Sequence, residues 1–195
     1  YGGVFLELLE NEVMHQMFEA FLGNSCILYN FGSTIMPPHG ATMASKIHID
    51  TPRFIPGYHA GLIMTLALDD FTQENGGTYY LPGSQHLSDP PDEELFELRK
   101  VSVARPKGSA VFFNPRTYHR GGFNATDALR AGVTVYAVRS FMKPRFEYTK
   151  MIPDAVAETL SERSRKFLGY HSRVPSKMEE FYVLPENRLY KAGQG

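Results

Sequence analysis

Short runs of β-forming residues, separated by Gly and Pro turns, fill the middle of the chain and limit the folds open to it. The turns include Asn75-Gly76-Gly77, Pro82-Gly83 and Pro106-Lys107-Gly108. Strands alternating with helices would indicate a parallel α/β sheet, and that pattern is absent. The spacing favours a sandwich, jelly roll or barrel. The β-rich runs are 26–31, 60–68, 77–81, 100–104, 109–113 and 131–141.

Helical periodicity precedes and follows this β core. Apolar residues three and four apart predict an N-terminal helix over about 4–22. The β core is expected over about 26–141. A second helix is predicted over about 153–168, with Pro153 near its start and Gly169 just past its end. The predicted order is helix, β core and helical tail.

Length and charge narrow the class of protein. The 195 residues predict a single domain, 1–195, with a core of its own. Twenty basic side chains balance twenty-one acidic ones, so we expect neither nucleic acid nor a membrane as a partner. A single cysteine, Cys26, and the lack of a leader predict a cytoplasmic location. The chain begins at Tyr1 rather than Met, so we interpret it as a fragment or the ordered part of a longer protein.

A His-x-Asp pair, His48 and Asp50, is the first candidate for chemistry. On a strand, residues two apart point to the same face, so the imidazole and the carboxylate converge. Two histidines and one carboxylate suit Fe(II) and leave three metal positions open, enough for a 2-oxo acid and dioxygen. The pair alone is weak evidence of a metal site, because such pairs also occur by chance at strand ends.

His119 and Arg130 supply the second half of the pattern. His119 is expected to open the strand that follows the apolar run 109–113, and Arg130 opens the apolar run after that. A guanidinium in an apolar strand needs an anionic partner, because an unpaired buried charge is costly. The distal carboxylate of 2-oxoglutarate fits this role. A surface acid such as Asp127 is the simpler alternative.

These residues together resemble the phytanoyl-CoA dioxygenase family over about residues 26–141. The resemblance implies a mainly β double-stranded β-helix (a jelly roll, cupin-like) with flanking N-terminal and C-terminal helices. It implies that His48, Asp50 and His119 are the catalytic triad that binds Fe(II), and that Arg130 binds 2-oxoglutarate. The elements that carry it are His48-x-Asp50, Asn75-Gly76-Gly77, Leu81-Pro82-Gly83-Ser84-Gln85-His86, His119, Asn124-Ala125-Thr126 and Arg130.

One departure from the family concerns the cosubstrate. Relatives often carry a serine two places after the second histidine that helps to bind 2-oxoglutarate, and this chain has Gly121 there. A replacement hydroxyl or amide is then needed. We name Thr78 and Asn30 as candidates for this cosubstrate-binding role.

The predicted activity is a dioxygenase reaction that hydroxylates a small organic substrate with dioxygen and releases succinate and CO2. Two alternatives stay open: a Zn-dependent cupin-type hydrolase or isomerase with the same ligands, and a non-catalytic β-sandwich module that binds a ligand. We expect the loops 51–58 and 88–95 to border the substrate cavity. The sequence predicts neither the substrate nor the oligomeric state.

Overall fold

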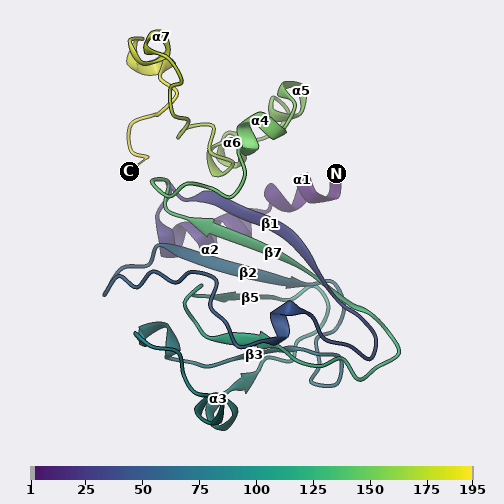
Figure 1. Ribbon diagram of the computed structural model, residues 1–195. Coiled ribbons are helices and arrows are strands. Elements are labelled where there is room, and N and C mark those ends of the chain that lie inside the picture. The colour runs from purple at the N-terminus through teal and green to yellow at the C-terminus, as the bar shows by residue number, and fades with distance from the viewer. Residues whose placement is uncertain (1–2, 195) are drawn as a thin grey trace. The chain divides into compact units, whose positions relative to one another are not determined.

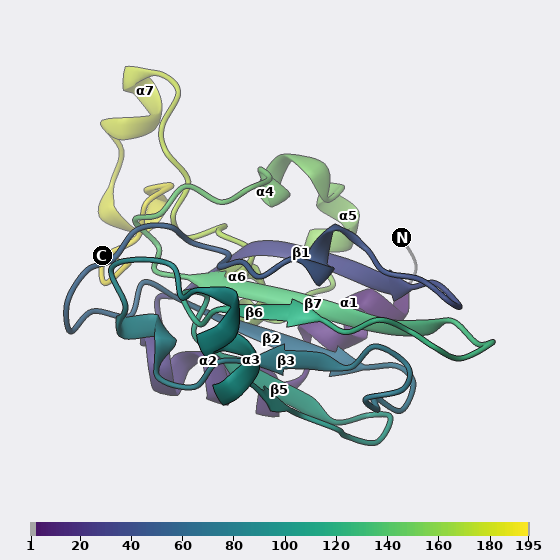
Figure 2. The same cartoon turned by 60° about the horizontal axis from the view of Figure 1, so that its bottom comes forward.

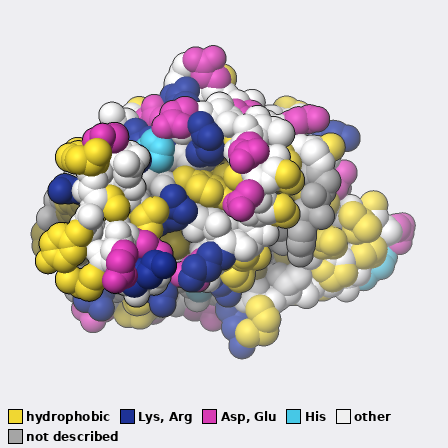
Figure 3. Space-filling view, turned by 90° about the horizontal axis from the view of Figure 1, so that it is seen from above, with side chains coloured by type: hydrophobic (Ala, Val, Ile, Leu, Met, Phe, Trp, Pro, Cys, Tyr) yellow, Lys and Arg dark blue, Asp and Glu magenta, His cyan; other side chains and the backbone are white. Residues whose placement is uncertain are grey.

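The computed structural model describes residues 3–194, and the chain forms two compact units. One unit holds the chain up to Asn30 and from Tyr136 onward, and the other runs from Phe31 to Val135. No helix within the described residues is both long and apolar enough to cross a membrane. Acidic and basic side chains are interspersed on the face shown in Figure 3, in keeping with the near-neutral composition.

Two sheets make up the β structure (Figures 1 and 2). The strands are β1 (Ile27–Met36), β2 (Gly61–Ala67), β3 (Thr78–Tyr80), β4 (Val101–Ser102), β5 (Ala110–Phe113), β6 (His119–Gly121) and β7 (Arg130–Val138). The larger sheet has the order β1-β7-β2-β5, and the smaller has the order β4-β3-β6. All six β-rich runs of the sequence contain a strand, and His119 opens β6 as predicted.

Strand register decides which side chains share a face. The pairs β2–β5, β3–β4 and β3–β6 are antiparallel, with Ile63 opposite Phe113 and Tyr80 opposite His119. Directly opposed residues point to the same side of a sheet. The Phe113 ring lies 4.9 Å from the His119 ring, measured between centroids, so the two sheets turn these faces toward one another.

The N-terminal helix is interrupted, which corrects the prediction of one helix over 4–22. The structure has α1 (Gly3–Leu9) and α2 (Glu12–Leu22). The helix is broken at Asn11, because the Asn11 side chain accepts a hydrogen bond of 2.9 Å from the Met14 N–H and so caps the start of α2.

The predicted helix over 153–168 is also divided, into α5 (Asp154–Ala157) and α6 (Glu162–Phe167). Ser161 caps α6 by accepting from the Ser164 N–H at 3.1 Å. Within the same compact unit, Phe167 stacks on Phe18 of α2, with 5.6 Å between ring centroids. The remaining helices are α3 (Glu93–Arg99), α4 (Tyr148–Met151) and α7 (Met178–Phe181), with short 3-10 turns at Met43–Ser45, Ser84–His86 and Pro185–Asn187.

Candidate metal centre

Alternation along residues 47–50 directs the His-x-Asp pair to one face. Ile47 and Ile49 pack against a buried apolar cluster formed by Leu81, Phe96 and Tyr118. His48 and Asp50 therefore point the other way. This segment forms a single β-bridge with β6 rather than the strand expected from the sequence, and the bridge joins His48 to His119.

Backbone hydrogen bonds fix the two segments against each other. The His48 N–H donates to the His119 carbonyl and the His119 N–H donates to the His48 carbonyl, both at 3.0 Å. The Asp50 N–H donates to the Pro115 carbonyl at 2.8 Å. The three predicted ligands are thus brought together by main-chain contacts, within one compact unit.

The side chains converge on a common point. One ligand atom from each of His48, Asp50 and His119 lies within 4.8 Å of the other two. The Asp50 carboxylate oxygens are 3.9 Å from Nε2 of His48 and 3.5 Å from Nε2 of His119. Ligand atoms about 2 Å from one metal ion lie about 3 Å apart, so small side-chain movements would close the set around a cation.

Both imidazoles are held in the tautomer that a metal requires. His48 Nδ1 contacts the Lys46 carbonyl at 2.7 Å, and His119 Nδ1 contacts the Thr117 carbonyl at 2.9 Å. A carbonyl can only accept, so each Nδ1 carries the proton and each Nε2 offers its lone pair to the centre. Such backbone contacts orient histidine ligands in metal sites. The donor set therefore fits Fe(II).

Burial keeps His119 neutral. Desolvation lowers the pKa of its imidazole, and His48 lowers it further, while the Asp50 carboxylate acts in the opposite direction. Its side chain is 9% exposed, against 32% for His48 and 35% for Asp50. The centre is thus closed on the His119 side and open to solvent beside the other two ligands, where further ligands could enter.

Arg130 is buried at the start of β7 and bonds to neutral groups. Its guanidinium donates to the carbonyls of Asn75, at 3.2 Å, and Gly76, at 2.9 Å. Burial, with the positive charge of Arg105 nearby, lowers its pKa to about 10, so it is charged at neutral pH. Asp127 is an exposed residue that contacts His39 instead, at 2.8 Å. The simpler pairing considered from the sequence is therefore not formed.

The Asn75-Gly76-Gly77 turn explains how carbonyls reach this arginine. Gly76 has a φ of +78°, and a Cβ there would lie 2.8 Å from the Gly122 carbonyl oxygen. Only glycine allows this close approach together with the left-handed backbone. The turn thus holds two carbonyl groups against the Arg130 guanidinium.

Thr78 and Asn30, which are expected from the sequence to help bind the cosubstrate, belong to different compact units. Thr78 is half-buried on β3, two residues from Tyr80 and so on the same face. Asn30 belongs to the other compact unit, and its role stays a prediction. Two residues that have no role in the sequence prediction lie nearby: Tyr80 stacks on the His119 ring with 5.9 Å between centroids, and burial lowers the pKa of Arg105 while the Tyr80 oxygen raises it. Arg105 had a weak signal only, a lone arginine before the Pro106 turn.

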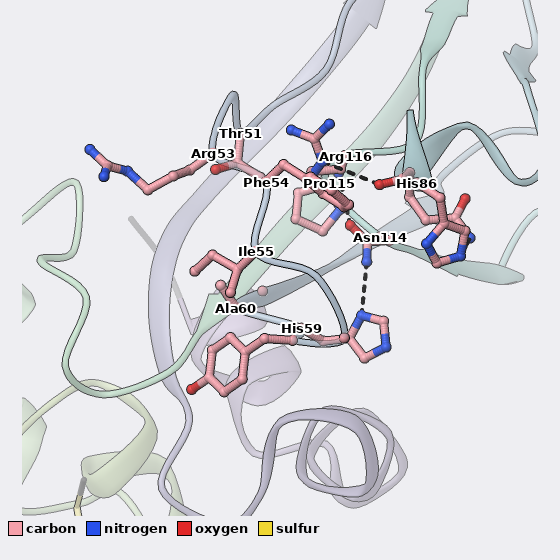
Figure 4. Close-up of a pocket in the computed structure, with 14 residues that line it drawn as sticks. Thr51, Arg53, Phe54, Ile55, His59, Ala60, His86, Asn114, Pro115 and Arg116 are labelled. Atoms are coloured by element: carbon pink, nitrogen blue, oxygen red, sulfur yellow. Dashed lines mark hydrogen bonds between the residues drawn. The ribbon is translucent and has the colours of Figure 1, made fainter. Parts of the chain in front are cut away.

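A pocket of about 100 Å³ lies in the same compact unit as the three candidate ligands, and Thr51, which lines it, directly follows Asp50 (Figure 4 shows the lining). Its residues come from the 51–61 loop, from Gln85 and His86, and from the 114–116 turn. His59 contacts Asn114 at 3.1 Å across it, and Arg53 points away from the other labelled residues. Residues of the 51–58 loop line this pocket and those of the 88–95 loop do not, and the role of either loop at a substrate cavity stays a prediction.

Comparison with known proteins decides the family. The sequence model of the phytanoyl-CoA dioxygenase (PhyH) family matches residues 4–132. The chain belongs to the phytanoyl-CoA dioxygenase family. Membership confirms the predicted enzyme class, a non-haem Fe(II)- and 2-oxoglutarate-dependent dioxygenase, which uses dioxygen and a small-molecule substrate. The Zn hydrolase and the non-catalytic module are thereby set aside.

Relatives by sequence include bacterial and fungal proteins. Rv1501 of Mycobacterium tuberculosis, described as uncharacterized, is 30% identical over 100% of this chain and 73% of its own length. The dioxygenase FrzG of Cladobotryum is 28% identical over 87% of the chain and 60% of its length. The Fe(II)/2-oxoglutarate-dependent dioxygenase nvfF of Aspergillus novofumigatus is 27% identical over 85% and 57%. The chain spans little more than half of these fungal relatives.

Solved structures share the fold. AviO1 from Streptomyces viridochromogenes has a TM-score of 0.60 at 24% identity, over 71% of this chain and 62% of its own. EvdO2 from Micromonospora carbonacea, solved with 2-oxoglutarate, has a TM-score of 0.56 at 23% identity, over 69% and 62%. These similarities confirm the mainly β, cupin-like fold with helices before and after the β core.

Proposed function

We propose that His48, Asp50 and His119 bind the catalytic Fe(II), and that Arg130 binds the distal carboxylate of 2-oxoglutarate, in an enzyme that hydroxylates a small organic molecule. One observation carries this assignment. Both histidines direct Nε2 to the Asp50 carboxylate, because each Nδ1 is already bonded to a backbone carbonyl. A buried arginine without an acidic partner among the described ion pairs lies in the same compact unit.

The bound Fe(II), with 2-oxoglutarate and dioxygen, would supply the oxidising chemistry, in which 2-oxoglutarate leaves as succinate and CO2 and one oxygen atom enters a substrate C–H bond. The protein's part is to position and to shield the reactants. His48, Asp50 and His119 would hold the ion, and a set of two histidines and one carboxylate would leave it room to bind 2-oxoglutarate and dioxygen. Arg130 sets the direction of the cosubstrate, since a guanidinium binds a carboxylate in a defined orientation.

The substrate is proposed to sit in the pocket beside the 51–61 loop. Thr51 of this pocket directly follows Asp50, and the Pro115 carbonyl accepts the Asp50 N–H, so the pocket opens next to the centre. Ligand pockets usually measure about 300 Å³ or more, so about 100 Å³ holds only part of a substrate. The pocket therefore receives the reacting end of the molecule.

Succinate formation tests the assignment. Native protein, Asp50→Ala and the control Asp154→Ala are incubated with Fe(II), 2-oxoglutarate and air, alone and with a panel of small organic compounds. We expect native protein and the control to form succinate, and Asp50→Ala to match a protein-free blank. Equal turnover by Asp50→Ala, or no turnover by native protein that is loaded with iron, would refute the assignment.

A further inference from the structure

Two buried arginines, Arg130 and Arg105, both contact the aromatic ring of Phe71. The Arg130 guanidinium carbon lies 4.0 Å from the centroid of the Phe71 ring, and that of Arg105 lies 4.2 Å from the same centroid. Arg130 is 5% exposed and Arg105 is 7% exposed. Like charges gathered in a buried place are unfavourable unless an anion binds between or beside them.

The protein itself does not neutralise this pair. Within residues 3–194, no ion pair joins either guanidinium to an acid. Arg105 bonds to neutral acceptors only, the Thr65 hydroxyl at 3.0 Å and the Val103 carbonyl at 3.4 Å. Asp69 raises the pKa of Arg130 from nearby, but its carboxylate accepts from the Ala131 N–H at 2.7 Å. The guanidiniums of Arg105 and Arg130 thus carry two positive charges, and the carboxylate of Asp69 supplies one negative charge near them.

Two buried polar atoms at this place have no hydrogen-bond partner among the described residues. They are Nε of Arg105 and the hydroxyl of Tyr80. Burial lowers the pKa of Arg105, and the two groups lie close enough for the Tyr80 oxygen to raise it, although no hydrogen bond of ordinary geometry joins them. Both can donate a hydrogen bond. Buried donors are rarely left unsatisfied, and such a group often marks where a ligand binds. A carboxylate could accept from both.

The arginine pair lies on the metal side of the sheets. Tyr80 is opposite His119 in the strand register, and the two rings stack with 5.9 Å between centroids. Thr65, which accepts from Arg105, lies two residues from Ile63, the partner of Phe113. Residues two apart share a face, so Thr65 and Phe113 point the same way, toward His119.

We propose that Arg105 is a second cation for the distal carboxylate of 2-oxoglutarate, and that the Tyr80 hydroxyl donates to the same carboxylate. This inference rests on the proposed function, which assigns only Arg130 to that carboxylate. Two arginines, Asp69 and one ligand carboxylate together are neutral, so the site is complete only with a dicarboxylic 2-oxo acid. Arg105 therefore determines specificity for 2-oxoglutarate over 2-oxo acids that have an uncharged tail.

Calorimetric titration of the Ni(II)-loaded protein tests this without turnover. The ligands are 2-oxoglutarate and 2-oxobutyrate, which lacks the distal carboxylate. The variants are Arg105→Met, Arg105→Lys and Tyr80→Phe, with Arg99→Met on exposed α3 as the control. We expect Arg105→Met to weaken 2-oxoglutarate binding by about 10- to 100-fold, and to lower the preference for it over 2-oxobutyrate by the same factor.

The conservative variants Arg105→Lys and Tyr80→Phe distinguish a loss of ligand binding from a loss of folding. Arg105→Lys keeps the charge and should lose less affinity than Arg105→Met, and Tyr80→Phe should lose about 3- to 10-fold while both proteins stay folded. Unchanged 2-oxoglutarate affinity in folded Arg105→Met and Tyr80→Phe would overturn this inference, and so would an equal loss of affinity for 2-oxoglutarate and 2-oxobutyrate. Either result would leave the proposed function standing. Failure of the native protein to bind 2-oxoglutarate would instead overturn the proposed function and this inference with it.

Discussion

His48 and His119 exchange two backbone hydrogen bonds of 3.0 Å, although they lie far apart in the sequence. Their rings are 4.2 Å apart between centroids. The spacing of the two imidazoles is thus set by the main chain, before any metal binds. Preorganised ligands of this kind lower the cost of assembling a metal site.

The two histidines should differ in what they contribute to folding. The His119 side chain is buried against the rings of Tyr80 and Phe113, whereas that of His48 is about one-third exposed. In metal-free protein we expect His119→Ala to lower the free energy of unfolding by about 2 kcal/mol, and His48→Ala by less than about 1 kcal/mol. Urea denaturation measures both. A larger loss for His48→Ala would contradict the burial argument.

Ser84, in the Pro-Gly-Ser-Gln-His turn, should support the centre from behind. Its hydroxyl donates to the Leu81 carbonyl at 2.6 Å and accepts from the Tyr118 N–H at 2.8 Å, next to His119. Ser84→Ala leaves the Tyr118 N–H unpaired, while the Leu81 carbonyl keeps its bond of 3.2 Å from the Ser84 N–H, so we expect a loss of about 1–3 kcal/mol in unfolding free energy. We also expect about tenfold weaker metal binding. Exposed Ser88→Ala is the control, and matching results for the two variants would show that the hydroxyl plays no part.

Arg116 should fix the walls of the pocket. Its guanidinium donates to the carbonyls of Pro52 at 2.9 Å, Gln85 at 3.2 Å and Leu87 at 2.6 Å (Figure 4 shows one of these bonds). Arg116→Met removes all three bonds and frees both loops. We expect faster amide hydrogen exchange at 52–58 and 85–88 but unchanged exchange in β7. Unchanged exchange in the two loops would show that they are held by other contacts.

Glu19 should make stability depend on pH. Arg163 donates to both its carboxylate oxygens, at 2.9 and 2.7 Å, and lowers the pKa of the carboxyl, while burial acts in the opposite direction. A carboxyl with a lowered folded pKa stabilises the fold above its unfolded pKa, and the contribution is lost as the pH falls through the folded pKa.

We therefore expect Glu19→Gln to cost about 0.5–1 kcal/mol at pH 7 and progressively less in acid. Urea unfolding at several pH values measures the difference, with exposed Glu158→Gln as the control. A difference between native protein and Glu19→Gln that is the same at every pH would contradict the role assigned to this ion pair.

Local patterns in the sequence predicted much of the fold and the ligands. Turn residues bounded the strands, and alternation placed Ile47 and Ile49 opposite His48 and Asp50. The helix breaks were missed because Asn11 and Ser161 lie inside apolar helical periodicity, where a cap competes with continuation of the helix.

The surroundings of the proposed cosubstrate site are less predictable from the sequence. Arg105 and Phe71 are joined by a bridge between segments that no short motif relates. Their approach to Arg130 depends on strand register, which is a property of the whole fold. The sequence alone therefore indicates Arg130, which opens a strand, as a candidate, and does not indicate Arg105, which lies beside a turn.

Anaerobic titration with Fe(II) tests directly whether His48, Asp50 and His119 hold the metal. Native protein and His119→Ala are titrated in the presence of 2-oxoglutarate, and metal binding is followed by visible charge-transfer absorption and by metal content, with circular dichroism to confirm folding. We expect one Fe(II) per native chain and an absorption band that appears only with 2-oxoglutarate, and we expect neither in His119→Ala. Stoichiometric iron and the same absorption in folded His119→Ala, or no iron bound by the native chain, would contradict this assignment.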